Sequence, residues 1–390
     1  MDQNRQEPIR VLQINSGSGT FGGVSSFLYN VYTNIDKEKL QFDFLSPDVT
    51  TYGIHRAEIE KAGGRIYELG IKGNILTRKT GLYKRLRQFL TKHRYSIVHI
   101  NSGNFFFNLF AVTAVRKAGV PCRIVHSHNA GDTNRSRIKK AVFKALKPQL
   151  ERNATLLLAC SRKAASYMFT DKTVREGGVQ IVKNGINAER FRFDPEIRKT
   201  VRRELGLADK FVVGHVGRFY KQKNHAFLIR IFEKIHEKEP ESVLLLFGKG
   251  DLETEVRDLV NELGLAPYVR FMGEVPDIER MYQAMDVFVM PSFHEGLPVS
   301  CVEIQAAGVP CVLSDTITEE IKIEDSMQFI SLTESPEIWA QAALARKGHR
   351  DMDGYESVIR SGYAIRDVAD GMFKMYKEMY KEMYKGSLAL

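Results

Sequence analysis

Short runs of β-branched and apolar residues alternate along this chain with amphipathic stretches of helical spacing, and this alternation limits the folds open to it. The first run is Ile9–Ile14, followed by a glycine-rich turn and a helical pattern over residues 24–34. Further runs in the first half are Phe42–Leu45, Arg65–Leu69, Ile97–Asn101, Arg123–His128, Leu156–Ser161 and Gln180–Lys183. Helical segments near residues 79–93, 105–118 and 135–151 separate several of them. We therefore predict an α/β fold with helices on both faces of a parallel sheet.

A second series of strand candidates starts afresh after the polar stretch Asn187–Lys199, which we interpret as a linker. Its members are Phe211–Val216, Val243–Phe247, Val269–Met272, Val287–Met290 and Pro310–Ser314. The two series predict two Rossmann-like domains, residues 1–190 and 191–369. Ligands bind beyond the carboxyl ends of the strands in such sheets, so two sheets facing each other would form a cleft with loops from both.

Residues 370–390 contain a four-residue repeat of Lys, Met, Tyr and Glu between Lys374 and Lys385. This period places each residue type on its own stripe of one long amphipathic helix. Packing of the Met and Tyr stripes into the protein core is one interpretation. The alternative is a helix at a membrane interface, with lysines beside the apolar stripes.

The composition excludes several classes of protein. A chain of 390 residues can bury two cores, and its 43% hydrophobic and 27% charged residues argue against disorder. No apolar run approaches the roughly 18 residues that cross a bilayer, and the polar start MDQNRQEP lacks the pattern of a signal peptide, so we expect a cytoplasmic protein. Four isolated cysteines, Cys122, Cys160, Cys301 and Cys311, indicate buried thiols rather than a zinc or redox site.

The net charge of +10 is unevenly divided. Residues 1–190 hold 31 Lys and Arg against 14 Asp and Glu, whereas residues 191–390 hold 26 against 33. Residues 78–94 and 135–152 each contain seven basic residues at helical spacing with apolar ones, a pattern suited to an anionic membrane surface. Ordinary amphipathic helices of an α/β domain are the alternative. No helix-turn-helix, zinc finger or aromatic nucleic-acid platform is evident, so we expect no nucleic-acid partner.

A G-x-G-x-x-G pattern, Gly17–Gly22, follows the first predicted strand and precedes a helix. This is the context of a dinucleotide-binding turn, in which glycines let the backbone approach a phosphate at a helix N-terminus. An NAD-dependent oxidoreductase would also need an acidic residue at the end of the second strand. Asp43 lies inside that strand instead, so the oxidoreductase remains an alternative and not the favoured function.

The segment Pro291–Glu303 carries the most specific pattern in the chain. It follows the strand Val287–Met290, and Pro298 suits the first turn of a helix. The backbone N–H groups of Gly296 and Leu297 would then lie at a helix N-terminus, where an anion is stabilised. Glu295 in the loop and Glu303 in the helix would offer two carboxylates for ligand hydroxyl groups.

This segment resembles the E-x7-E signature of the retaining family 4 glycosyltransferases of the GT-B fold, many of which build bacterial surface polysaccharides. Gly22-Gly23 is similar to the glycine loop of that family, and His126-Ser-His128 to its histidine segment. Further similar segments are Asn184-Gly185, Gly214–Arg218 with Lys223, Phe247–Gly250 and Phe271–Gly273. The resemblance extends over both predicted domains, and it implies that the last helix packs back on the N-terminal domain.

The resemblance implies a role for each matching residue. Arg218 and Lys223 would neutralise the donor diphosphate without a metal, Glu303 would hold the ribose hydroxyls, and Glu295 a sugar hydroxyl. Gly22, Gly23, Gly296 and Leu297 would line the donor site. His128 would position the donor sugar, with a general-base role as the alternative. Glu295 as an enzymic nucleophile is the alternative to the front-face displacement generally attributed to this family.

We expect His126 and His128 to point to opposite faces of the sheet, with only His128 directed to the active site. Asp351-Met-Asp353 is a D-x-D pattern of the kind that binds a metal in another glycosyltransferase fold, but its polar surroundings favour an exposed turn.

The predicted activity is transfer of a hexose or N-acetylhexosamine from a nucleotide sugar to a lipid-linked oligosaccharide or polysaccharide. We expect UDP rather than GDP as the carrier, and no other cofactor. The N-terminal domain would receive the acceptor, and the protein would work in the cytoplasm or peripherally at the inner face of the plasma membrane.

Overall fold

The computed structural model describes residues 7–17, 22–71, 75–129 and 137–385, and its chain divides into two compact units. The N-terminal unit contains residues 1–185 and 365–390, and the C-terminal unit contains residues 186–364. The first division lies before the predicted boundary at 190 because Ile186 bridges Ala364 and donates its N–H to the carbonyl of Tyr363 at 2.9 Å. The C-terminal unit is thus an insertion in the N-terminal one.

Seven parallel strands form the sheet of the N-terminal unit in the order β3-β2-β1-β4-β5-β6-β7. Their bounds are β1 Ile9–Asn15, β2 Leu40–Ser46, β3 Arg65–Glu68, β4 Ile97–Ser102, β5 Cys122–Ser127, β6 Leu156–Ala159 and β7 Gln180–Ile181. Every strand predicted in this half is present, and each end lies within two residues of the prediction. Short runs of apolar and β-branched residues therefore locate the strands well.

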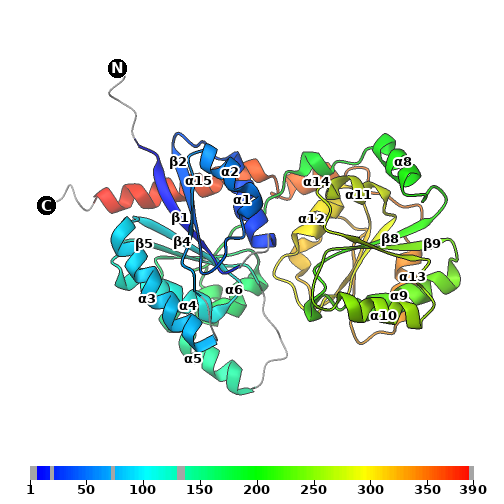
Figure 1. Ribbon diagram of the computed structural model, residues 1–390, viewed down its shortest axis with the longest axis horizontal. Helices are drawn as coiled ribbons and strands as arrows, with labels where there is room; N and C mark the ends of the chain where they lie inside the picture. Colours follow the sequence, from blue (N-terminus) through cyan, green and yellow to red (C-terminus); the bar gives the residue numbers. More distant parts are fainter. Residues whose placement is uncertain (1–6, 18–21, 72–74, 130–136, 386–390) are drawn as a thin grey trace. The chain divides into compact units, whose positions relative to one another are not determined.

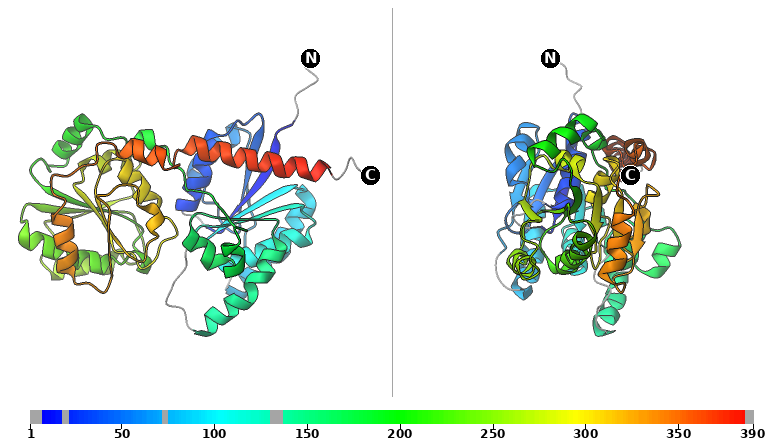
Figure 2. Two further views of the ribbon diagram at one scale, coloured as in Figure 1. Left: turned by 180° about the vertical axis from the view of Figure 1, so that it is seen from behind. Right: turned by 90° about the vertical axis from the view of Figure 1, so that its right-hand side faces the viewer.

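Helices cover both faces of this sheet, as the alternation predicts. They are α1 Gly23–Asn34, α2 Arg56–Lys61, α3 Ile75–His93, α4 Phe105–Lys117, α5 Arg137–Asn153, α6 Arg162–Met168, α7 Asp171–Arg175 and α15 Ile365–Lys385, with the 3-10 helix η1 Gly53–His55. Helices α1 and α15 lie on one face, and α3, α4 and α5 lie side by side on the other (Figure 1, Figure 2).

Helix α15 completes the core of the N-terminal unit. It begins at Ile365, before the predicted residue 370, and the side chains of Met372, Met375 and Tyr376 are buried. They join one cluster with Phe27 of α1 and Phe42 of β2. The Met and Tyr stripes therefore pack into the protein core, which confirms that interpretation of the repeat over the membrane-interface alternative.

The C-terminal unit contains six strands in the order β10-β9-β8-β11-β12-β13, all paired in parallel. Their bounds are β8 Phe211–Val216, β9 Ser242–Phe247, β10 Val269–Gly273, β11 Val287–Met290, β12 Cys311–Ser314 and β13 Gln328–Ile330. Only β13 was not predicted. Its helices are η2 Ala188–Phe191, α8 Pro195–Glu204, η3 Lys221–Lys223, α9 His225–Lys238, α10 Glu253–Glu262, α11 Ile278–Ala284, α12 Val299–Ala306, η4 Glu319–Ile321, α13 Pro336–Leu344 and α14 Gly354–Arg360.

The predicted linker Asn187–Lys199 is wrong, because most of this stretch is helical and anchored. Asp194 caps α8 by accepting from the N–H groups of Glu196 and Ile197 at 2.8 and 3.1 Å. Pro195 occupies the first helical position, where its missing N–H costs nothing. Arg198 of α8 forms an ion pair with Asp286, which precedes β11. The Asp-Pro pair that suggested a linker is therefore a helix start.

The structure also bears on the predictions for the cysteines, for the D-x-D pattern and for membrane-spanning helices. All four cysteines are buried thiols, as predicted. Asp351 of the D-x-D pattern accepts from Ser326 and pairs with His349, and the described residues contain no cluster of three or more His, Cys, Asp or Glu suited to a metal. Within the same ranges, no helix has the length and apolar character needed to cross a membrane.

Candidate active site

The loop between β11 and α12 carries the two predicted glutamates at the carboxyl edge of the C-terminal sheet. The carbonyl of Ser292 accepts from the hydroxyls of Ser314 and Thr316 at 2.6 and 2.8 Å, which fixes the start of the loop to β12. Pro298 occupies the N-cap position of α12, directly before its first turn rather than within it. Glu295 is therefore held in the loop, and Glu303 lies one turn into the helix, as predicted.

Glu295 and Lys223 form an ion pair that the sequence analysis missed. Their Oε1 and Nζ atoms lie 2.8 Å apart, and both side chains are largely buried. Gln222 reinforces the contact: its carbonyl accepts from the N–H of Phe293, and its Nε2 donates to the carbonyl of His294, both at 2.8 Å. The structure thus joins a residue assigned to the diphosphate with one assigned to the sugar.

Arg218 follows β8 and differs from Lys223 in its surroundings. Its side chain is exposed, and its guanidinium lies 4.8 Å from the ring centre of Tyr220. Close backbone contacts surround it: a Cβ added to Gly248, whose φ is +126°, would lie 2.3 Å from the carbonyl oxygen of Gly217. Only glycine permits that conformation and that approach at position 248. The arginine therefore projects from a rigid turn and remains accessible to an anion.

Glu303 is a carboxylate with an unusual proton affinity. The hydroxyl of Tyr282 in α11 donates to its Oε2 at 3.0 Å. Burial raises the pKa of Glu303 to about 7, while the hydrogen bond from Tyr282 and the positive charge of Arg190 act in the opposite direction. Glu303 therefore changes its charge near neutral pH. The sequence offered no signal for Tyr282, which lies 21 positions earlier on another helix.

In the N-terminal unit, Gly22 and His128 lie at the carboxyl edge of their sheet. Gly22 is the extended N-cap residue of α1, and a Cβ added to Gly22 or Gly23 would meet no atom of the described residues within 4 Å. The open space in front of these glycines is compatible with a close ligand. His128 directly follows β5, and its Nε2 lies 3.2 Å from Oδ1 of Asn101, which is in β4.

A chain of buried hydrogen bonds connects His128 to the C-terminal helix. Nε2 of Gln13 donates to the hydroxyl of Tyr376 at 3.0 Å, and this hydroxyl lies 2.6 Å from Nδ1 of His99. Nδ2 of Asn101 donates to Oε1 of Gln13 at 2.9 Å, which leaves Oδ1 of Asn101 as the acceptor for His128. His128 must therefore carry its proton on Nε2.

The expectation that His126 and His128 point to opposite faces is wrong. Residues two apart along an extended segment share a face, and the two ring centres lie 4.0 Å apart. His126 is buried and His128 is half-buried, and burial lowers the pKa of His128 to about 3 and that of His126 well below its usual value. Both imidazoles are therefore neutral at physiological pH.

Two family models together match most of the chain. The glycosyl transferase 4-like domain matches residues 22–185, and the group 1 glycosyl transferases match residues 210–346. Putative glycosyltransferase EpsF of Bacillus subtilis is 33% identical over 384 residues, which cover 94% of this chain and 96% of EpsF. The chain belongs to the family 4 glycosyltransferases of the GT-B fold.

Two other proteins extend the comparison of this glycosyltransferase. The UDP-Gal:alpha-D-GlcNAc-diphosphoundecaprenol alpha-1,3-galactosyltransferase of Escherichia coli is 31% identical over 59% of this chain and 60% of its own length. The crystal structure of Anabaena HepE in complex with UDP-glucose has a TM-score of 0.69 at 17% identity and covers 98% of this chain and 100% of HepE. The second likeness concerns the fold alone.

The oxidoreductase alternative has no support in these relatives, and Asp43 is unsuited to bind a ribose. Its side chain is fully buried in β2, where Oδ1 accepts from Arg10 at 2.7 Å and Oδ2 from the hydroxyl of Tyr95 at 2.6 Å. Gly17 donates its N–H to Oδ1 of Asn15, and residues 18–21 of the glycine pattern lie outside the described residues. Asp43 thus has a structural role.

The hydrogen-bond chain predicts the tautomer of His128. In ¹⁵N NMR spectra, His128 should carry its proton on Nε2 and remain neutral from pH 8 to pH 5, because burial lowers its pKa to about 3. Asn101→Leu removes the acceptor and should let the Nδ1-protonated form appear. Asn104→Leu, a helix-cap change outside this chain of bonds, is the control. A wild-type His128 protonated on Nδ1, or titrating above pH 5, would contradict the assignment.

Proposed function

We propose that this glycosyltransferase transfers a hexose or N-acetylhexosamine from a UDP-sugar to a lipid-linked oligosaccharide or polysaccharide. The observation that carries the proposal is the grouping of Glu295, Glu303, Lys223 and Arg218 at one sheet edge beside the N-terminus of α12. The named activity of the Escherichia coli relative supports a UDP-sugar donor and a lipid diphosphate acceptor.

Of the two basic side chains, Arg218 is the one more available to the donor diphosphate. It is exposed, whereas the ammonium of Lys223 is already paired with Glu295. The N-terminus of α12, with the backbone of Gly296 and Leu297 just before it, adds the positive end of a helix dipole. A leaving UDP gains negative charge on its β-phosphate, so these groups would stabilise the transition state without a metal.

The two carboxylates suit the hydroxyl groups on either side of the diphosphate. Glu303, with one oxygen held by Tyr282, would accept from the ribose hydroxyls, and Glu295, oriented by Lys223, would accept from a hydroxyl of the transferred sugar. Gly22, Gly23 and His128 of the N-terminal unit would complete the donor site. A neutral His128 suits positioning of the sugar better than proton abstraction, because a group with a pKa of about 3 is a weak base.

UDP binding should depend on the charge of Glu303. Since its pKa is about 7 and its ionised form accepts hydroxyl protons, calorimetry should show affinity rising by up to about tenfold between pH 6 and pH 8. Glu303→Gln should remove most of this rise and weaken binding at pH 8 by about tenfold or more. Glu319→Gln, at an exposed position in η4, is the control that shares the titration of UDP itself. Equal affinity of wild type and Glu303→Gln at pH 8 would exclude this role.

Retention and metal independence can be tested on slow hydrolysis of donors by water. We propose that the leaving phosphate assists attack on the same face of the sugar, so the first product of an α-linked UDP-sugar should be the α-anomer by ¹H NMR. Equal rates with EDTA or Mg²⁺ are expected, because Arg218 and the helix N-terminus stabilise the leaving group. Arg218→Ala should lower the rate about 100-fold, whereas Arg203→Ala on α8 should not. An initial β-anomer, or a rate that requires Mg²⁺, would contradict the mechanism.

We also propose that α3 and α5 dock the N-terminal unit on an anionic membrane at the inner face of the plasma membrane. Leu82, Leu86 and Leu90 of α3 are buried, whereas Lys84 and Arg87 are exposed. The same division holds for α5, where Leu150 is buried and Lys144 and Arg152 are exposed. Docking through these helices would therefore be electrostatic rather than insertive.

Sedimentation with vesicles tests this docking. The protein should pellet with phosphatidylglycerol vesicles at 50 mM salt and be released at about 500 mM, because salt screens exposed charges. Lys84→Glu combined with Arg87→Glu should weaken pelleting by about tenfold or more, at roughly 1 kcal/mol for each charge near the surface. Lys199→Glu with Arg203→Glu, on α8 of the C-terminal unit, makes the same charge change elsewhere. Equal pelleting of the two variants would show that α3 is not part of the membrane-docking surface.

A further inference from the structure

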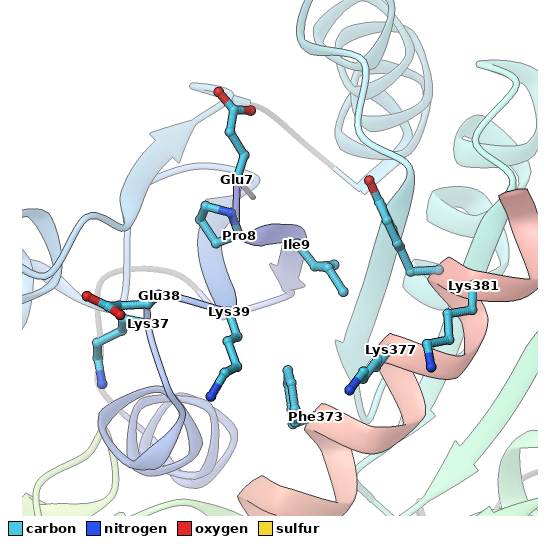
Figure 3. A pocket seen from close by; sticks show the side chains of 10 residues that line it. Glu7, Pro8, Ile9, Lys37, Glu38, Lys39, Phe373, Lys377 and Lys381 are labelled. Atoms are coloured by element: carbon cyan, nitrogen blue, oxygen red, sulfur yellow. The ribbon is translucent and has the colours of Figure 1, made fainter. Parts of the chain in front are cut away.

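A pocket of about 750 Å³ lies at the amino edge of the N-terminal sheet. Its walls come from three segments: Glu7–Ile9 at the start of β1, Lys37–Lys39 before β2, and the middle of α15 from Phe373 to Lys381 (Figure 3). Gly22 and His128 lie at the opposite, carboxyl edge. The length of β1 alone separates the two edges by roughly 20 Å. The pocket is thus distinct from the proposed donor site.

The pocket gathers positive charge from segments far apart in the sequence. Four of its ten lining residues are lysines, Lys37, Lys39, Lys377 and Lys381, against two glutamates, Glu7 and Glu38. Figure 3 shows the ammonium groups of Lys39 and Lys377 on either side of the ring of Phe373, with that of Lys381 next along the helix, whereas the carboxyl groups of the two glutamates point away from that ring. The lining therefore has an excess of two positive charges.

The lysines differ in what already binds them. Nζ of Lys37 donates to the carbonyls of Thr33 and Ile35, both at 3.2 Å, and Lys39 pairs with Asp36 at 2.6 Å. Among the described residues, no carboxylate pairs with Lys377 or Lys381. Nζ of Lys377 lies over the ring of Phe373, 5.8 Å from the ring centre. Two ammonium groups on one helix face thus remain available to a ligand.

The spacing of these two lysines also favours an anion. They are four residues apart in α15, so they lie on the same face one turn apart, where like charges repel and destabilise the helix. An anion between them would replace repulsion by two attractions. A phosphoryl group suits the site better than a carboxylate, since it brings about two negative charges and three acceptor oxygens.

We propose that this pocket is a second binding site, for a phosphoryl group attached to an apolar moiety. Lys377 and Lys381 bind the phosphoryl oxygens, and Lys39 contributes from the opposite wall. Phe373, Ile9 and Pro8 form the apolar floor for the attached group. A lipid headgroup and a soluble phosphorylated compound share this chemistry. Because the site lies at the amino edge, a ligand there acts on the seating of α15 and not on the donor directly.

Calorimetry with inorganic pyrophosphate tests the site. UDP is present in excess, so that any pyrophosphate binding at the donor site is suppressed. Wild-type protein should bind one pyrophosphate, more weakly as salt rises, and Lys377→Ala with Lys381→Ala should weaken this binding by about tenfold or more. Lys199→Ala with Arg203→Ala removes an equally spaced basic pair from α8 and should leave pyrophosphate binding unchanged.

The effects of the variants distinguish pyrophosphate binding in this pocket from pyrophosphate binding at the proposed donor site. Loss of pyrophosphate binding in Arg218→Ala, with retention in the Lys377 and Lys381 variant, would overturn the proposal even if UDP binds as expected. Equal binding by wild type and the Lys377 and Lys381 variant would also overturn it. If UDP does not bind, the comparison of the Lys377 and Lys381 variant and of the Lys199 and Arg203 variant with wild type still tests the proposal.

Vesicles identify the source of the phosphoryl group. Phosphatidylglycerol and phosphatidylcholine vesicles are compared in the background of Lys84→Glu with Arg87→Glu, which removes the charges of α3. Pelleting with phosphatidylglycerol that depends on Lys377 and Lys381 supports a lipid headgroup. Binding of pyrophosphate without such pelleting supports a soluble phosphorylated ligand. Absence of both overturns the proposal.

Discussion

The hydroxyl of Tyr376 is the contact on which the N-terminal unit depends. It accepts from Gln13 and lies 2.6 Å from Nδ1 of His99, so it joins the last helix of the chain to β1 and β4. Gln13 and Tyr376 are 363 positions apart, and 179 of the residues between them form the other unit. The core of the N-terminal unit therefore lacks one wall until the C-terminal unit has been made. Such long-range closure slows folding and favours folding of the inserted unit first.

The hydroxyl of Tyr376 also determines the tautomer of His128, which lies at the other end of the hydrogen-bond chain. Because Tyr376 accepts from Gln13, the amide orientations of Gln13 and Asn101 are determined, and with them the tautomer of His128. A helix that seals a core thus also orients a side chain of the candidate active site.

The sequence predicted the parts of the fold that depend on local pattern. Twelve of the parallel strands lie in short runs of apolar and β-branched residues, so they could be located from the sequence, but β13 has only Gln328–Ile330 and no such run. Asp194-Pro195 led to the wrong prediction of a linker, because the same pair of residues occurs both at the start of helices and in linkers. Glu295 and Glu303 could be found because they share one local motif. Lys223 and Glu295 are 72 positions apart, and their pairing follows from the sheet order, which no local pattern encodes.

The difference in net charge between the two parts of the chain is larger when the chain is divided into its two structural units than when it is divided after residue 190. Residues 186–364 hold 22 Lys and Arg against 30 Asp and Glu, a net charge of −8, which leaves +18 for the N-terminal unit. An acidic unit can hold a diphosphate only where its own acids are neutralised locally. The pair of Lys223 with Glu295 does this, since it adds no net charge, and Glu303 is only partly ionised at neutral pH. The exposed guanidinium of Arg218 and the N-terminus of α12 then determine the local potential, and the distant surface acids are screened by salt.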